Sequence, residues 1–204
     1  MLHKSYFLFK EELQVRRSNK YIILHHTKDA MPHTADDVHK VHQRKGMAGI
    51  GYHYFIDKKG EIYEGRPVNT VGAHARGFNA ESIGIGFEGD YNKETLGERP
   101  LNAAAMLIAL LKFYYFWENI EVKTWNDLNK ETDDPGKNFP FERLKRKVEE
   151  CLNCLNAFFG EQWGKNKDNF YIPDGVYGKV LEILAGDYGV DDYGDPDREC
   201  VERD

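Results

Sequence analysis

Three parts of the chain have short apolar runs or an alternation of apolar and polar residues, and these patterns predict β-strands. Residues 20–27, KYIILHHT, form an apolar run with polar flanks, which is typical of a strand buried inside a sheet. Residues 49–67 hold two alternating runs around Asp-Lys-Lys-Gly, and this arrangement predicts a β-hairpin. Residues 82–91, SIGIGFEGDY, predict a further strand whose glycines indicate close backbone packing.

Three other segments have the longer period of helices. A capping signal begins at Thr34 and predicts a short helix that ends at Gly46. Residues 101–120 are apolar on most sides, as expected of a helix that buries much of its surface, and residues 140–163 predict an amphipathic helix. Strands that alternate with helices around a buried strand predict an α/β fold, with a central sheet flanked by helices.

Length and charge limit the possible classes of protein. The 204 residues suffice for one packed domain, and the net charge of −6 argues against nucleic acid as a partner. No apolar run reaches the length of a membrane span. The N-terminal stretch has too short an apolar core for a signal peptide, so we expect a protein that is cytoplasmic or released when a cell lyses.

A change in composition near residue 164 suggests where the main domain ends. Residues 164–170, GKNKDNF, are polar and typical of a linker. We therefore expect one domain over residues 1–160 and a short C-terminal segment over residues 161–204. That segment is too small to form a core of its own.

All eight histidines lie at or before His74. His25 and His26 end the buried strand and, because side chains alternate along a strand, they point to opposite faces of the sheet. The C-terminal end of a strand is a common place for a site in an α/β sheet, although a core role for these histidines is equally possible. His39 and His42 share one face of the predicted helix, which favours an exposed face over a metal-binding pair.

Two further segments contain candidate site residues. Tyr52 and His53 lie in GYHYF and point to opposite faces of their strand. A tyrosine hydroxyl that faces a site can donate to an oxyanion, whereas a core tyrosine needs only a hydrogen-bonded hydroxyl. His74 lies in a glycine-bounded loop, VGAHARGFN, and loops on a rigid scaffold often carry binding residues.

Taken together, these motifs resemble a known family. HHT, GYHYFIDKKGEIYEGRP, VGAHARGFNAESIGIGFEGDY and TDDPGKNFP follow one another between about Tyr21 and Leu144. In this order they are similar to the zinc-dependent N-acetylmuramoyl-L-alanine amidases and the related peptidoglycan recognition proteins. The resemblance implies a mixed sheet flanked by helices in an amidase-like domain over residues 1–160. It also implies hydrolysis of the amide between N-acetylmuramic acid and L-alanine in peptidoglycan or muropeptides.

The resemblance also assigns roles to individual residues. The family's first zinc ligand corresponds to His25, and the third ligand, which is cysteine or aspartate in the family, corresponds to Asp134. Tyr52 and Thr132 match the positions that stabilise the oxyanion of the tetrahedral intermediate. The family pattern therefore implies zinc as the cofactor and these four residues as parts of the catalytic site.

One position departs from the family pattern. His74 and Asn79 match the loop expected beside the substrate groove, but Trp125 occupies the position of the second zinc ligand. An indole N–H has no lone pair for a metal, and catalytic zinc normally has three protein ligands. The nearby carboxylates of Asp127 and Asp133 are the remaining candidates for a third ligand.

These observations leave alternative functions open. We expect a zinc-dependent peptidoglycan hydrolase of the endolysin or autolysin type. The alternative is a non-catalytic peptidoglycan-binding protein on the same fold. In the second case Trp125 serves as a stacking platform for sugar or fills the metal cavity. A protein-interaction scaffold is a third class, and a deliberate replacement of a metal ligand would give the same sequence. Residues 180–199 resemble the start of a cell-wall-binding repeat found in some phage and bacterial lysins.

Overall fold

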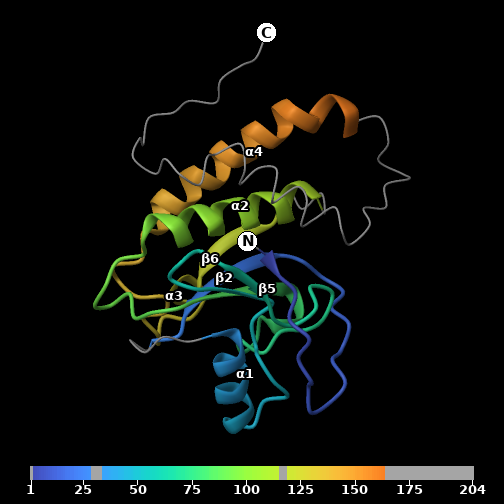
Figure 1. The fold of residues 1–204 in the computed structure, drawn as a ribbon, viewed down its shortest axis with the longest axis vertical. Helices are drawn as coiled ribbons and strands as arrows, with labels where there is room; N and C mark the ends of the chain where they lie inside the picture. Colours follow the sequence, from blue (N-terminus) through green and yellow to red (C-terminus); the bar gives the residue numbers. More distant parts are fainter. Residues whose placement is uncertain (1, 29–33, 115–118, 164–204) are drawn as a thin grey trace.

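A mixed sheet of six strands forms the centre of the fold (Figure 1). The computed structural model describes residues 2–28, 34–114 and 119–163. Within them the strands lie side by side in the order β1-β4-β3-β5-β2-β6, and β3 and β4 are the antiparallel pair among parallel neighbours. The strands are β1 (Leu2–His3), β2 (Tyr21–His26), β3 (Tyr54–Ile56), β4 (Ile62–Glu64), β5 (Ser82–Phe87) and β6 (Glu121–Thr124).

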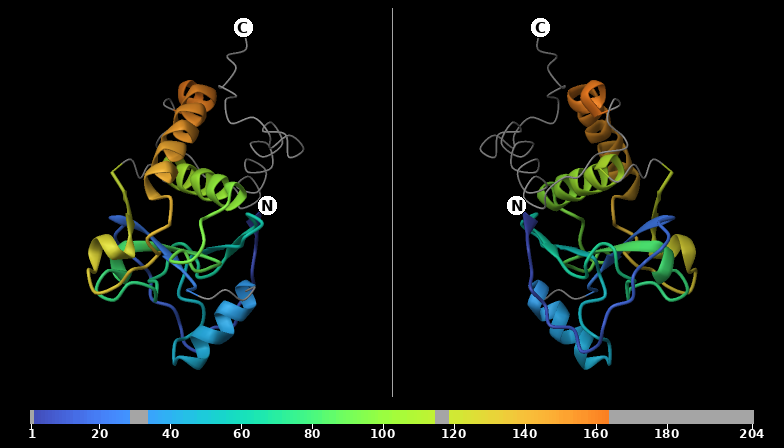
Figure 2. Two further views of the ribbon diagram at one scale, coloured as in Figure 1. Left: turned by 90° about the vertical axis from the view of Figure 1, so that its left-hand side faces the viewer. Right: turned by 90° about the vertical axis from the view of Figure 1, so that its right-hand side faces the viewer.

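Helices cover both faces of this sheet. Helices α2 (Glu98–Tyr114) and α4 (Phe141–Trp163) pack together on one face, and α1 (Ala35–Arg44) lies on the opposite face (Figures 1 and 2). A short helix, α3 (Trp125–Leu128), follows β6 directly. The predicted α/β fold with a mixed central sheet is therefore confirmed.

Most of the predicted elements are present with small shifts of their ends. The capping box at the start of α1 forms as expected, because Thr34 and Asp37 each accept a backbone N–H of the other residue. The predicted helix over residues 101–120 begins earlier, at Glu98, and is described as far as Tyr114. Two strands were not predicted: β1 is very short, and β6 lies at the sheet edge and is too polar to give an apolar pattern.

Strand β5 shows how the two faces of the sheet differ. Ile83, Ile85 and Phe87 point to the side of α2 and α4 and belong to the larger hydrophobic core. Gly84 and Gly86 point to the side of α1, where a smaller core of five buried residues forms. That smaller core contains Ala35, Val38, Ile50, Tyr52 and Phe55. The glycines leave space on the α1 face, where side chains from loops can approach the sheet.

The N-terminal segment packs against α1 with alternating side chains. Phe7 stacks on His39 with ring centroids 4.5 Å apart, and Phe9 meets the same ring edge-on at 5.6 Å. Tyr6 and Leu8, between and beside them, are 92% and 88% exposed. The segment therefore covers α1 with every second side chain.

The expectations about a membrane span and about the C-terminal segment can be compared with the described residues. No helix in the described ranges is both long and apolar enough to cross a membrane. The linker, the segment that resembles a cell-wall-binding repeat and the proposed boundary after residue 160 concern residues that lie largely outside the described ranges. The division into two segments therefore stays a prediction.

Phe7 and Phe9 should contribute more to the stability of the fold than the exposed residues beside them. Replacing Phe7 or Phe9 by alanine should lower the free energy of unfolding by about 1–3 kcal/mol, since each ring is partly buried against α1. The matched replacements Tyr6→Ala and Leu8→Ala should change it by less than about 0.5 kcal/mol. Urea denaturation of the four variants measures both effects, and equal losses at all four positions would contradict the alternating packing.

Candidate functional site

The ends of β2 and β6 bring three of the predicted residues together on the α1 face. In the parallel pairing Leu24 lies opposite Thr124, so the next residues, His25 and Trp125, become neighbours. Their ring centroids are 6.1 Å apart. Asp134 reaches the same place from a loop, and its Oδ2 lies 2.8 Å from Nδ1 of His25. The structure therefore places all three predicted zinc-ligand positions around one point.

Asp134 is held by several hydrogen bonds. While Oδ2 pairs with His25, Oδ1 accepts the backbone N–H of His26 at 2.9 Å. The backbone carbonyl of Asp134 accepts the N–H of Asn126, at the start of α3, at 2.8 Å. Both carboxylate oxygens thus have protein partners in this structure.

The second nitrogen of His25 also has a partner. Nε2 of His25 lies 3.0 Å from Nδ1 of His74, so one of the two rings donates to the other. Nε2 of His74 is buried and has no hydrogen-bond partner among the described residues. Burial, with smaller effects from His25 and His53, holds the pKa of His74 well below its usual value. His74 is therefore a neutral ring that joins the predicted loop to His25.

Two aromatic rings fit into the space above β5. The Tyr52 ring lies 5.5 Å from that of His25. A Cβ at Gly86 would lie 2.4 Å from the Tyr52 ring, and a Cβ at Gly84 would lie 2.4 Å from the His74 ring. Burial raises the pKa of Tyr52, so its phenol stays protonated and remains a hydrogen-bond donor. The glycines of SIGIGF are thus needed for the site to form.

Two other predicted residues hold the loops of the site. Oδ1 of Asn79 accepts the backbone N–H groups of His74 and Ala75 at 2.9 and 2.8 Å. Oγ1 of Thr132 accepts the N–H of Asp134 at 3.2 Å. Both residues therefore have structural partners inside the site, and their predicted contacts with substrate or oxyanion stay predictions.

Trp125 belongs to an aromatic cluster at the edge of the site. Its half-buried ring meets Phe78 edge-on, with centroids 6.0 Å apart, and Phe78 meets Tyr21 in the same way at 5.9 Å. The cluster joins the end of β6 to the loop that carries His74. The indole is thus packed in place next to His25.

The side chains at this point do not fit a zinc site with three ligands. Trp125 offers no lone pair, and His25 and Asp134 are bonded to each other. Asp127 accepts the N-cap backbone N–H of α3 at 2.9 Å, and Asp133 pairs with a lysine and an asparagine outside the site. In the described part of the chain, no group of three histidine, cysteine or acidic side chains is arranged to hold a metal.

The prediction that His39 and His42 lie on an exposed face of α1 is wrong, because neither side chain is exposed. Nδ1 of His39 accepts the N–H of Ile50 at 3.2 Å, and Nδ1 of His42 accepts that of Gly51 at 2.9 Å. Burial, together with nearby cations, lowers the pKa of His42 to about 4. Both rings thus hold the segment that leads into Tyr52, a role that spacing on a helix does not reveal.

His53 supports the same segment from inside the sheet. It is completely buried, its Nδ1 accepts the N–H of Gly84 at 2.9 Å, and its Nε2 lies 2.9 Å from the carbonyl of Thr70. These contacts require the neutral tautomer with its proton on Nε2. Burial lowers the pKa of His53 to about 3.

Comparisons of the sequence agree with the motifs. A family model described as N-acetylmuramoyl-L-alanine amidase matches residues 15–137. Peptidoglycan-recognition protein SC2 of Drosophila melanogaster is 38% identical over 97 residues, which cover 44% of this chain and 53% of that protein. Peptidoglycan recognition protein 1 of Bos taurus is 33% identical over 133 residues, which cover 60% of this chain and 70% of that protein. The chain spans about half the length of the fly relatives that it matches.

Solved structures show the same fold. The N-acetylmuramoyl-L-alanine amidase LysC from Clostridium intestinale has a TM-score of 0.66 and 35% identity, over 73% of this chain and 97% of that chain. A tyrosine-to-phenylalanine mutant of Drosophila PGRP-LB, solved in complex with tracheal cytotoxin, has a TM-score of 0.59 and 29% identity. That match covers 69% of this chain and 91% of that chain. Both enzymes and recognition proteins are thus similar to this chain.

The burial of His53 predicts how stability depends on pH. Because the folded chain keeps this ring neutral, its contribution is complete above the unfolded pKa of about 6.5 and is lost as the pH falls toward 3. Between pH 7 and pH 5 this residue should account for about 2 kcal/mol of lost stability. His53→Gln, which keeps a donor and an acceptor, should show a correspondingly smaller loss in urea denaturation, and equal slopes for both proteins would contradict the assignment.

Proposed function

The chain belongs to the family of N-acetylmuramoyl-L-alanine amidases, and we propose that it binds peptidoglycan fragments but holds no zinc and does not cleave them. The single observation that carries this proposal is the direct bond between His25 and Asp134, with Trp125 at the remaining ligand position. Two ligand positions that satisfy each other, beside an indole, favour a metal-free site. Peptidoglycan or muropeptides are the partners on this proposal.

Trp125 and Tyr52 are the residues that we expect to contact the ligand. The half-buried indole offers an apolar face on which a sugar ring can stack. The protonated phenol of Tyr52 offers a hydrogen-bond donor for a carbonyl of the lactyl group or the peptide. His74, with Asn79 behind it, forms the wall next to His25. The similarity to a recognition protein solved with tracheal cytotoxin supports this type of ligand.

Hydrolysis is the second candidate function. It is favoured by the convergence of His25, Tyr52 and Asp134 at one point, as the resemblance implies for an amidase of the endolysin type. Zinc would supply a Lewis acid and an activated water in such an enzyme. The described residues offer two of the three ligands that this chemistry requires, so the proposal of binding without cleavage has the stronger support.

A binding assay combined with metal analysis tests the proposal. Protein purified without chelators should contain far less than one zinc per chain, bind soluble muropeptides with the same affinity with and without EDTA, and leave isolated cell wall uncleaved. Trp125→Ala should weaken muropeptide binding about two- to twelvefold, since an aromatic contact contributes about 0.5–1.5 kcal/mol. Isothermal titration calorimetry measures the affinity, and elemental analysis measures the zinc.

Two control variants sharpen this experiment. Tyr6→Ala removes an aromatic ring that is 92% exposed on the N-terminal segment, and it should leave muropeptide affinity unchanged. Trp125→His should create stoichiometric zinc binding, because it supplies the third ligand beside His25 and Asp134. Stoichiometric zinc in the unaltered protein, together with release of peptides from cell wall, would overturn the proposal in favour of the amidase.

A further inference from the structure

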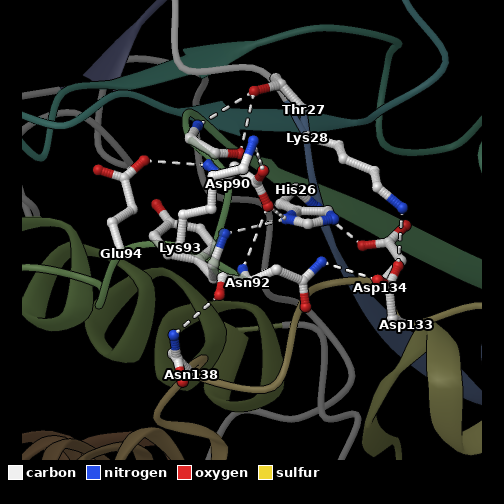
Figure 3. Close-up of polar contacts among 12 residues, drawn as sticks. His26, Thr27, Lys28, Asp90, Asn92, Lys93, Glu94, Asp133, Asp134 and Asn138 are labelled. Atoms are coloured by element: carbon white, nitrogen blue, oxygen red, sulfur yellow. Dashed lines mark hydrogen bonds and ion pairs between the residues drawn. The ribbon is translucent and has the colours of Figure 1, made fainter.

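The loop that carries Asp134 is bonded both to Asn126 at the start of α3 and to Asn92, in the segment that follows β5. We call residues 132–138 the Asp134 loop. Figure 3 shows Asn92, in the segment that follows β5, directed toward Asp133 of this loop. These contacts lie outside the site formed by His25, Tyr52 and Trp125.

Asn92 makes three hydrogen bonds to the Asp134 loop. Its Nδ2 donates to Oδ2 of Asp133 at 2.8 Å, and its Oδ1 accepts the N–H of Lys137 at 3.2 Å. Its backbone carbonyl accepts Nδ2 of Asn138, also at 3.2 Å (Figure 3). One residue thus holds the loop on both sides of Pro135 and Gly136.

The two backbones also touch at one point. Gly136 has a φ of +109°, and a Cβ there would lie 2.4 Å from the carbonyl carbon of Tyr91. The N–H of Asn138 donates to the carbonyl of Tyr91 at 2.8 Å. Glycine is required at this position for both reasons, so the Asp134 loop can approach Asn92 closely.

Another contact of the same loop is weaker. Nζ of Lys28 lies 3.0 Å from Oδ1 of Asp133, but the two side chains are 60% and 52% exposed. Ion pairs between exposed side chains contribute little, because water and salt screen them. Asp133 thus has two side-chain partners from outside the loop, Lys28 and Asn92, and of these Asn92 also bonds the backbone of the loop at Lys137.

We propose that Asn92 and Asp133 act as a positioning pair that sets the Asp134 carboxylate against His25 and His26. In an amidase with three zinc ligands, the metal ties this loop to the sheet. Here the described donor set does not fit the metal, so contacts within the protein, these hydrogen bonds among them, hold Asp134 in place. On this proposal Asn92 and Asp133 do not contact the muropeptide themselves. Its effect on binding rests on the proposed function, whereas its effect on Asp134 does not.

Hydrogen exchange provides a readout that needs no ligand. The backbone N–H of His26 donates to Oδ1 of Asp134, so its protection from exchange reports whether that carboxylate is in place. Asn92→Asp puts a second carboxylate next to Asp133 and should increase the exchange rate of this N–H about tenfold. Asp133→Asn in the same chain restores one donor and one acceptor across the pair, and it should recover most of the protection.

Muropeptide affinity is the second readout. It should fall about five- to tenfold in Asn92→Asp and recover in the double variant Asn92→Asp/Asp133→Asn. Lys28→Met, which removes only the exposed ion pair, is the matched control and should change either readout less than about twofold. If Asn92→Asp unfolds, Asn92→Ala gives the same comparison without the repulsion between carboxylates.

The outcomes separate this inference from the proposed function. Faster exchange at His26 that is reversed in the double variant supports the positioning pair, even if the unaltered protein fails to bind muropeptides. Unchanged exchange at His26 in both Asn92→Asp and Asn92→Ala overturns it, whatever the protein binds. Faster exchange without recovery in the double variant also overturns it, because a general loss of structure would then explain the effect.

Discussion

The hydrogen bond between Nδ1 of His25 and Oδ2 of Asp134 is the central interaction of this site. The family resemblance implies that both side chains would hold zinc in an amidase. Here they are 2.8 Å apart and bond to each other, while Trp125 occupies the position of the family's second ligand. On the proposed function, a site that closes on itself in this way depends on hydrogen bonds that keep a loop against the end of a strand.

The fold supports that bond from several directions. Parallel pairing of β2 with β6 places Trp125 next to His25, and Gly84 and Gly86 in β5 leave room for the rings above the sheet. Buried neutral histidines hold the backbone around the site, because each accepts a backbone N–H that would otherwise be unsatisfied.

The sequence predicted the layers of the fold, since the apolar run of β2 and the hairpin of β3 and β4 have strong periods. The motif resemblance also located His25, Asp134 and Trp125, which the structure brings together. Strand β6 was missed because its edge position leaves it polar. The acceptor role of His39 depends on the backbone N–H of Ile50, which the fold brings to the ring, so helical spacing could not reveal it. Asn79 accepts N–H groups of its own motif, at His74 and Ala75, but the motif does not show which side chain closes that turn.

A crystal structure grown with excess zinc, with anomalous diffraction recorded at the zinc edge, tests the central claim most directly. A metal-free site should give no anomalous peak between His25 and Asp134, and the hydrogen bond between them should be intact at about 2.8 Å. A strong peak at that point, with both side chains turned toward it and a third ligand supplied by the chain or by water, would contradict the account. Zinc bound in this way would favour the amidase function instead.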